Sequence, residues 1–69
     1  MNIANYRILV WRKNHDHETP QAVGFAGSKR SIMHLFAKAV QQAGQKNWRR
    51  VVACEGGYLT GTYLQDWHV

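Results

Sequence analysis

The stretch Ser28–Gly44, SKRSIMHLFAKAVQQAG, decides the fold of this chain. Its apolar residues recur at spacings of three and four, which places them on one side of an α-helix. They are Ile32, Leu35, Phe36, Ala39, Val40 and Ala43. Ser28 can accept a hydrogen bond from a free N–H of the first turn, and Gly44 can adopt the left-handed conformation that ends a helix. The sequence therefore predicts a helix here, with its apolar side on the core.

The opposite side of this helix is basic. It carries Arg30, His34 and Lys38, and the whole stretch contains no acidic residue. Exposed helices usually alternate opposite charges, because like charges four residues apart repel each other. Lys29 and Arg30 also lie at the positive end of the helix dipole, where an exposed cation costs about 0.3–1 kcal/mol. This arrangement weakens the helix, which indicates that the cations serve binding; the alternative is that they only keep the protein soluble.

Four short segments around the helix have the composition of β-strands. β-branched and aromatic residues alternate in Tyr6–Arg12, and the apolar Gln21–Ala26 contains a glycine that can carry a bulge. Trp48–Cys54 and Tyr58–Leu64 are separated by glycines that favour a hairpin. We therefore expect a single domain over 1–69 with an α+β fold of order β-β-α-β-β. An antiparallel sheet of three to four strands would carry the one helix on one face.

The predicted hairpin also assigns side chains to the two faces of the sheet. Its turn is expected at Gly56 and Gly57, because glycine tolerates positive φ angles. This register places Val52, Cys54 and Gly61 on the face that the helix covers. Gly61 would then leave room for the helix against the sheet.

The other face of the sheet is expected to be apolar as well. Leu9, Trp11 and Val51 are assigned to it, and one helix cannot cover both faces of a sheet. A chain of 69 residues buries only about 60% of its unfolded surface, so association is a source of further stability. We therefore predict a homodimer that self-associates through these three residues.

The charge balance limits the classes of partner. The chain has nine Lys or Arg and four Asp or Glu, and its formal net charge is +5. Such a chain attracts nucleic acid, an anionic membrane or an acidic protein. No apolar run is long enough to span a membrane, and the first residues lack the basic start of a signal peptide. We therefore expect a cytoplasmic protein with no membrane partner.

The cysteine and histidine content argues against disulfide and metal chemistry. The lone Cys54 cannot form a disulfide within the chain and is expected to be a buried thiol in a reducing cytoplasm. His15, Asp16, His17 and Glu18 are all potential metal ligands. They adjoin one another in a polar loop, whereas a metal site needs ligands that converge and are held by further hydrogen bonds. We predict neither a metal site nor a cofactor.

The remaining side chains favour binding over catalysis. The four acids are scattered and form no evident acid–base pair, so we predict that the protein is not an enzyme. In the first interpretation, the basic helix face and the anchors Trp48, Arg49 and Arg50 contact an acidic surface of a protein or nucleoprotein complex. In the second, the same cations contact nucleic-acid phosphates and an aromatic ring stacks on a base. Gly24–Gly27 is interpreted as a strand-to-helix turn, with phosphate contact as the alternative.

A small chain whose strands flank one helix, without catalytic residues, resembles the inhibitor proteins that phages make against host defence or transcription. Anti-CRISPR proteins are among them. The resemblance is one of layout over most of the chain, and it assigns no residue a role. It implies a protein that occupies a functional surface of a host protein. Many such inhibitors are acidic mimics of nucleic acid, whereas this chain is basic, which favours direct blocking of an acidic site or of a complex that handles nucleic acid.

Overall fold

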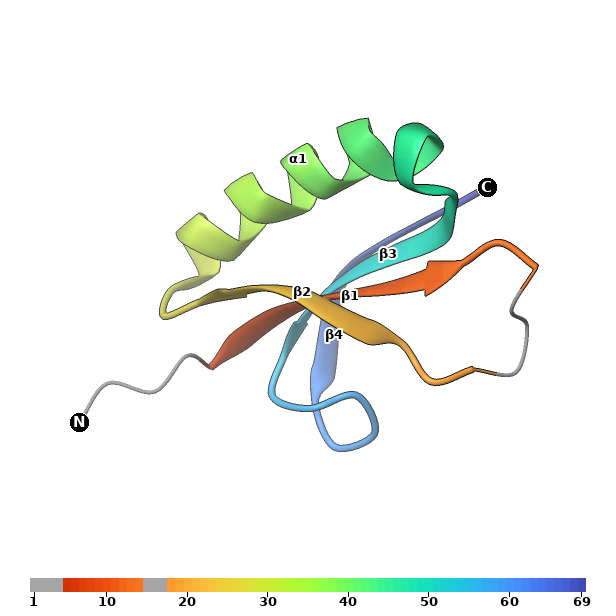
Figure 1. Ribbon diagram of the computed structural model, residues 1–69. Coiled ribbons are helices and arrows are strands. Elements are labelled where there is room, and N and C mark those ends of the chain that lie inside the picture. The colour runs from red at the N-terminus through yellow and green to blue at the C-terminus, as the bar shows by residue number, and fades with distance from the viewer. Residues whose placement is uncertain (1–4, 15–17) are drawn as a thin grey trace.

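The computed structural model describes residues 5–14 and 18–69. Its elements are β1 (Tyr6–Arg12), β2 (Gln21–Ala26), α1 (Lys29–Lys46), β3 (Trp48–Glu55) and β4 (Thr62–His68). The strands form one antiparallel sheet in the order β2-β1-β3-β4, and α1 lies on one face of it (Figure 1). The predicted α+β fold, with four antiparallel strands and one helix, is confirmed.

Strands β1 and β2 have the predicted bounds, and β2 carries a bulge. Ile8 pairs with Gly24 and Leu9 pairs with Ala22, so Val23 is the extra residue. A Cβ atom at Gly24 would lie 3.3 Å from Cγ1 of Ile8. Glycine therefore lets the bulged strand lie close to its neighbour on the side of α1.

The start of α1 is as predicted, and its end is not. The N–H of Ser31 donates to Oγ of Ser28 at 3.2 Å, so Ser28 is the N-cap. The prediction that Gly44 ends the helix is wrong, because Asn47 takes the left-handed conformation with φ of 59° and donates to the carbonyl of Ala43. Asparagine tolerates this conformation better than most residues. The N–H of Lys13 donates to the Asn47 carbonyl at 2.7 Å, which ties the helix end to the end of β1.

Each face of the sheet has its own core. The core under α1 is formed by alternate residues of the central strands together with the apolar side of the helix: Ile8, Val10, Val51, Ala53, Ile32, Ala39 and Ala43. The opposite face carries Leu9, Trp11, Val52 and Cys54. The predicted assignment of β3 is therefore wrong, because Val51 faces the helix while Val52 and Cys54 face away from it.

The β3–β4 connection also differs from the prediction. It is a loop over 56–61 rather than a two-residue turn, and the register changes again between Ala53 and Cys54. Gly56 has a φ of +87°, and the N–H of Gly61 donates to the Gly57 carbonyl at 2.8 Å. A Cβ atom at Gly61 would overlap the carbonyl oxygens of Glu55 and Gly57. Gly61 is thus needed by the loop itself, and the prediction that it makes room for the helix is wrong.

The face without the helix is covered by this loop and by an arginine. The ring of Trp11 meets that of Tyr58 edge to face, with centroids 5.9 Å apart, and the guanidinium of Arg50 lies 4.7 Å from the Trp11 ring centroid. As a result Leu9, Trp11 and Val51 are 3%, 5% and 0% exposed within a single chain. These residues offer almost no surface for the predicted self-association, and self-association itself stays a prediction.

Candidate functional site

Two arginines of the sheet are held by acids of this chain. The guanidinium of Arg12 donates to both carboxylate oxygens of Glu18, at 2.9 and 2.6 Å. The guanidinium of Arg50 donates to both oxygens of Asp66, at 3.0 and 2.5 Å. Two-pronged pairs of this kind fix the arginine in place. The charges of Arg12 and Arg50 are therefore compensated within the chain.

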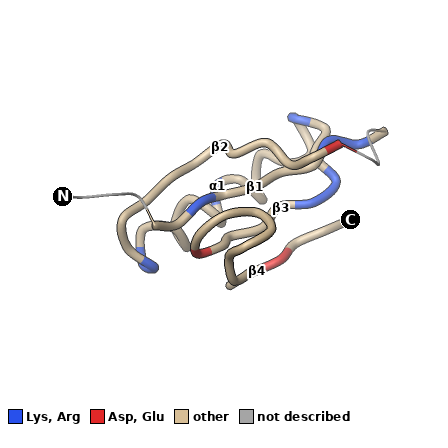
Figure 2. The backbone as a smooth tube through the Cα atoms, turned by 90° about the horizontal axis from the view of Figure 1, so that it is seen from below, with Lys and Arg blue, Asp and Glu red and all other residues tan. Residues whose placement is uncertain are grey.

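The cations of α1 are exposed and unpaired. Lys29, Arg30, Lys38 and Lys46 are all exposed, and within residues 5–14 and 18–69 none of them forms an ion pair. The helix has no acid in its first turn, where the dipole would favour one. Figure 2 shows basic segments at the start of α1, in the middle of the molecule beside the labels α1 and β1, and around the far ends of β1 and β3. We call these four side chains the helix cations.

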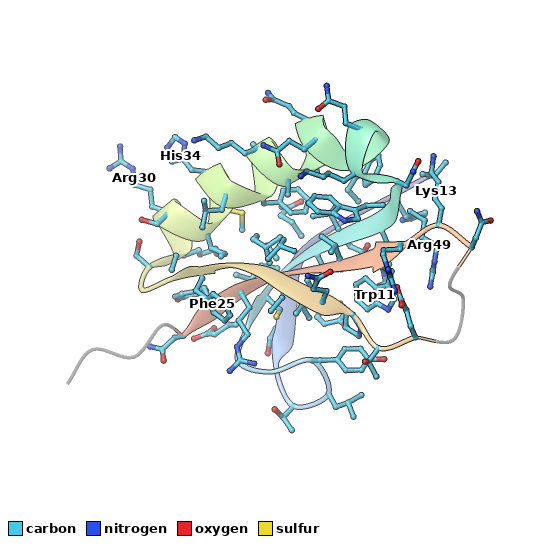
Figure 3. All side chains as sticks on the ribbon, viewed as in Figure 1. Trp11, Lys13, Phe25, Arg30, His34 and Arg49 are labelled. Atoms are coloured by element: carbon cyan, nitrogen blue, oxygen red, sulfur yellow. The ribbon has the colours of Figure 1, made fainter. Side chains whose placement is uncertain are left out.

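The helix cations do not lie in one straight row. Arg30 and His34 border a shallow open depression together with Met33 and Ala37, and both point outward from the start of α1 (Figure 3). Lys38 instead borders a groove between α1 and β2. Residues four apart on a helix are rotated by about 40°, so Lys38 is turned by about 80° from Arg30.

Arg50, a predicted partner-binding residue, is part of the protein's own packing. Its guanidinium lies 4.7 Å from the Trp11 ring and 5.6 Å from the Tyr63 ring, besides its pair with Asp66. Such contacts hold a cation against an apolar surface.

The other two predicted anchors lie elsewhere. Arg49 donates through Nε to the carbonyl of Arg12 at 3.2 Å, and Figure 3 shows it near Lys13 at the far end of β1. Trp48 packs against the helix-side core and lines the groove beside Lys38. The structure therefore divides the predicted cluster among the helix, the groove and the packing of the sheet.

Exposed apolar side chains form a feature that the sequence did not indicate. Leu59 is 83% exposed at the loop, and Phe25 is 56% exposed on β2. Phe25 points away from α1 (Figure 3), and the guanidinium of Arg7 lies 6.0 Å from its ring centroid. Leu59 lies in the segment Tyr58–Leu64 that was predicted to be a strand, and this pattern gave no sign of exposure. For Phe25, the sequence signal for exposure is the alternation of side chains between the two faces of β2.

Cys54 is a buried thiol, as expected. It is 0% exposed in the core opposite α1, and burial raises its pKa above the usual value of 9.0. The His15, Asp16 and His17 of the predicted polar loop lie outside the described residues. Among residues 5–14 and 18–69 there is no group of three His, Cys, Asp or Glu side chains that could hold a metal ion. In the same part of the chain, no helix combines the length and apolarity needed to cross a membrane.

The Arg50–Asp66 pair predicts a pH dependence of stability. The hydrogen bonds from Arg50 lower the pKa of Asp66 below its usual value of 3.8. A lowered folded-state pKa stabilises the fold above the unfolded-state value, and this contribution is lost as pH falls through the folded-state pKa. We expect Asp66→Asn to be less stable than wild type at about pH 6 and the difference to shrink towards about pH 2. Urea unfolding at a series of pH values checks this, and a constant difference would contradict it.

Comparisons of the chain with protein families, with characterised proteins and with solved structures found no match. The functional interpretation therefore rests on the geometry of the described residues.

Proposed function

We propose that this protein is a small non-enzymatic binding protein that occupies an acidic functional surface of another protein. The observation that carries the proposal is the set of helix cations, which are exposed and unpaired while the strand arginines Arg12 and Arg50 are neutralised. A fold that needed charge only for stability would place acids in the first turn of α1, where it has none. Opposite charge on a partner would compensate the helix cations and steer association.

Apolar and aromatic anchors support an interface with a protein. Phe25 and Leu59 are exposed, and Tyr58 and Tyr63 are each 37% exposed. Aromatic residues and arginine are enriched at the energetic centres of interfaces, where they fill pockets on the partner. This set lies on or beside the face of the sheet that α1 does not cover, so the protein could engage a partner with more than its helix.

The resemblance to phage inhibitors fits this role, since an inhibitor needs only to cover a functional surface. The partner would be a host protein or a nucleoprotein complex, and the site of action the reducing cytoplasm, where the free thiol of Cys54 is stable. A homodimer remains part of the proposal. Its contact would use exposed side chains, because Leu9, Trp11 and Val51 are buried.

Affinity capture from the source cell, with and without nuclease, tests the class of partner. We expect a specific protein to be retained by the tagged chain after nuclease treatment, because the anchors bind protein surfaces. Nuclease-sensitive recovery of nucleic acid alone would contradict the proposal and favour a nucleic-acid-binding module. In that case affinity for an oligonucleotide would fall with salt at a log–log slope set by the number of phosphates contacted.

A further inference from the structure

A groove of about 520 Å³ runs between α1 and β2. It exists because α1 packs mainly over β3 and β1, so that β2 is less covered. Figure 1 shows α1 and β2 joined by the short turn at Gly27 and separating towards the C-terminal end of the helix. The volume lies in the range of ligand-binding clefts.

The lining of the groove combines an apolar floor with a basic rim. Val23 on β2 is 40% exposed there, although it is apolar, and Leu35 and Trp48 line the same space. Lys38 and Lys46 border it from the helix, and no acid of residues 5–14 or 18–69 is among its lining. A ligand that matches this surface carries negative charge on either side of an apolar group.

The spacing of the two lysines matches an extended chain. Lys38 and Lys46 are eight residues apart on α1, which corresponds to about 12 Å at 1.5 Å per residue. In an extended segment, side chains four residues apart point to the same side and lie about 13 Å from each other. The side chain midway between them also points to that side and would meet the floor of the groove, to which Ala39 of α1 and Val23 of β2 belong.

We propose that the groove binds an extended segment of the partner protein with the pattern acidic–x–apolar–x–acidic. This inference rests on the proposed function and names the part of the partner that Lys38 and Lys46 recognise. The segment lies against α1 rather than pairing with the edge of β2, because the bulge at Val23 interrupts that edge. Val23 and Leu35 of the lining suit an apolar side chain, whereas nucleic-acid bases stack on aromatic rings and would find Trp48 alone among the described lining residues.

A peptide titration followed by NMR tests the groove directly. The probe is the acetylated and amidated peptide SESLSES, and the control is SSLEESS, which has the same composition but adjacent acids. We expect SESLSES to shift the amide resonances of β2 and of the facing side of α1, and SSLEESS to bind at least tenfold more weakly. Equal binding of the two peptides, or shifts centred on Arg30 and His34, would overturn the proposal.

Matched variants separate the groove from general charge attraction. Lys38→Glu/Lys46→Glu reverses two cations at the groove, and Lys29→Glu/Arg30→Glu reverses two cations of the same helix outside it. We expect the first variant to lose binding of SESLSES by at least tenfold and the second to change it less than threefold. Equal losses in both would overturn the assignment to the groove.

Two further measurements test the groove if the double variant does not fold and compare the peptide with a nucleic acid. If the Lys38→Glu/Lys46→Glu variant does not fold, Val23→Glu places an acid in the groove on a half-exposed side chain and leaves both lysines intact. It should lose SESLSES binding to the same extent, and unchanged binding would contradict the proposal. A seven-nucleotide oligothymidylate that shifts the same resonances at lower concentration than SESLSES would overturn the choice of a peptide.

The experiments distinguish a wrong assignment of the groove from a wrong proposed function. If SESLSES does not bind while reversal of the helix cations still abolishes retention of a partner protein, only the groove assignment is wrong. If no protein is retained by wild type after nuclease treatment, the proposed function itself is wrong.

Discussion

Replacement of Trp11 by alanine is expected to unfold most of the protein. The side chain is 5% exposed and lies between Tyr58 and the guanidinium of Arg50 in the core opposite α1. Removing a buried tryptophan typically costs about 3–5 kcal/mol. A domain of 69 residues has a total stability of only about 3–10 kcal/mol. Urea unfolding monitored by far-ultraviolet circular dichroism should therefore show a loss that leaves little or no folded baseline.

The control for this variant is Leu59→Ala. Leu59 is 83% exposed on the loop that covers the Trp11 face, so its truncation should change stability by less than about 0.5 kcal/mol. Sedimentation of both variants separates core packing from self-association. If wild type is a dimer and Trp11→Ala is a folded monomer, Trp11 is an intermolecular contact. That result would contradict the core that we describe.

Elements with local signals were predictable from the sequence. The three-and-four spacing of Ile32, Leu35 and Phe36 defines the apolar side of α1, and Ser28 marks its start because the capping bond spans only three residues. Alternation likewise defined β1 with its observed bounds. The end of α1 was predicted at Gly44 because glycine is the usual residue in the left-handed conformation that ends a helix. Asn47 can take the same backbone conformation.

Features that depend on distant pairing were not predictable. Gly56 and Gly57 match a tight hairpin turn, whereas the longer loop closed by Gly61 gives β4 a different register against β3. The faces of Val51 and Val52 are set by the pairing of β3 with β1 and by the position of α1, which covers the side of Val51. The local pattern of β3 does not show either of these.

The candidate site likewise has some features that the sequence shows and others that only the structure shows. That the helix lacks acids is visible in the sequence, and so are Lys29, Arg30 and Lys38. Lys46 was not predicted as part of the site, because it follows Gly44, where the helix was expected to end. The pair between Arg50 and Asp66 joins residues of neighbouring strands, so its neutralisation of Arg50 requires the β3–β4 register. The groove beside Lys38 requires in addition the position of α1 over β1 and β3. The spacing of apolar residues along one helix does not say which strands that helix covers.

Reversal of two helix cations is expected to abolish binding and spare the fold. In Arg30→Glu/Lys38→Glu, one change lies on the outer side of α1 and one at the groove. Like charges facing each other across an interface cost several kcal/mol, which corresponds to a loss of affinity of at least about a hundredfold. Stability should stay the same or rise slightly, because an acid near the start of a helix is favoured by about 0.3–1 kcal/mol.

A variant of equal net charge controls for general electrostatics. Arg7→Glu/Lys13→Glu makes the same change in charge on and beside β1, away from the helix. Its affinity for the partner is expected to fall by no more than about tenfold, since long-range attraction is weakened while the contacts of α1 remain. A larger loss in this variant than in Arg30→Glu/Lys38→Glu would place the interface on the sheet instead.

The most direct measurement is the amount of partner protein retained on wild type and on Arg30→Glu/Lys38→Glu after nuclease treatment, at equal amounts of folded bait. We predict that wild type retains the partner, that the double variant retains at most a few per cent of that amount, and that both unfold at the same urea concentration or the variant at a slightly higher one. Full retention by the folded double variant would contradict the claim that the cations of α1 form the binding surface.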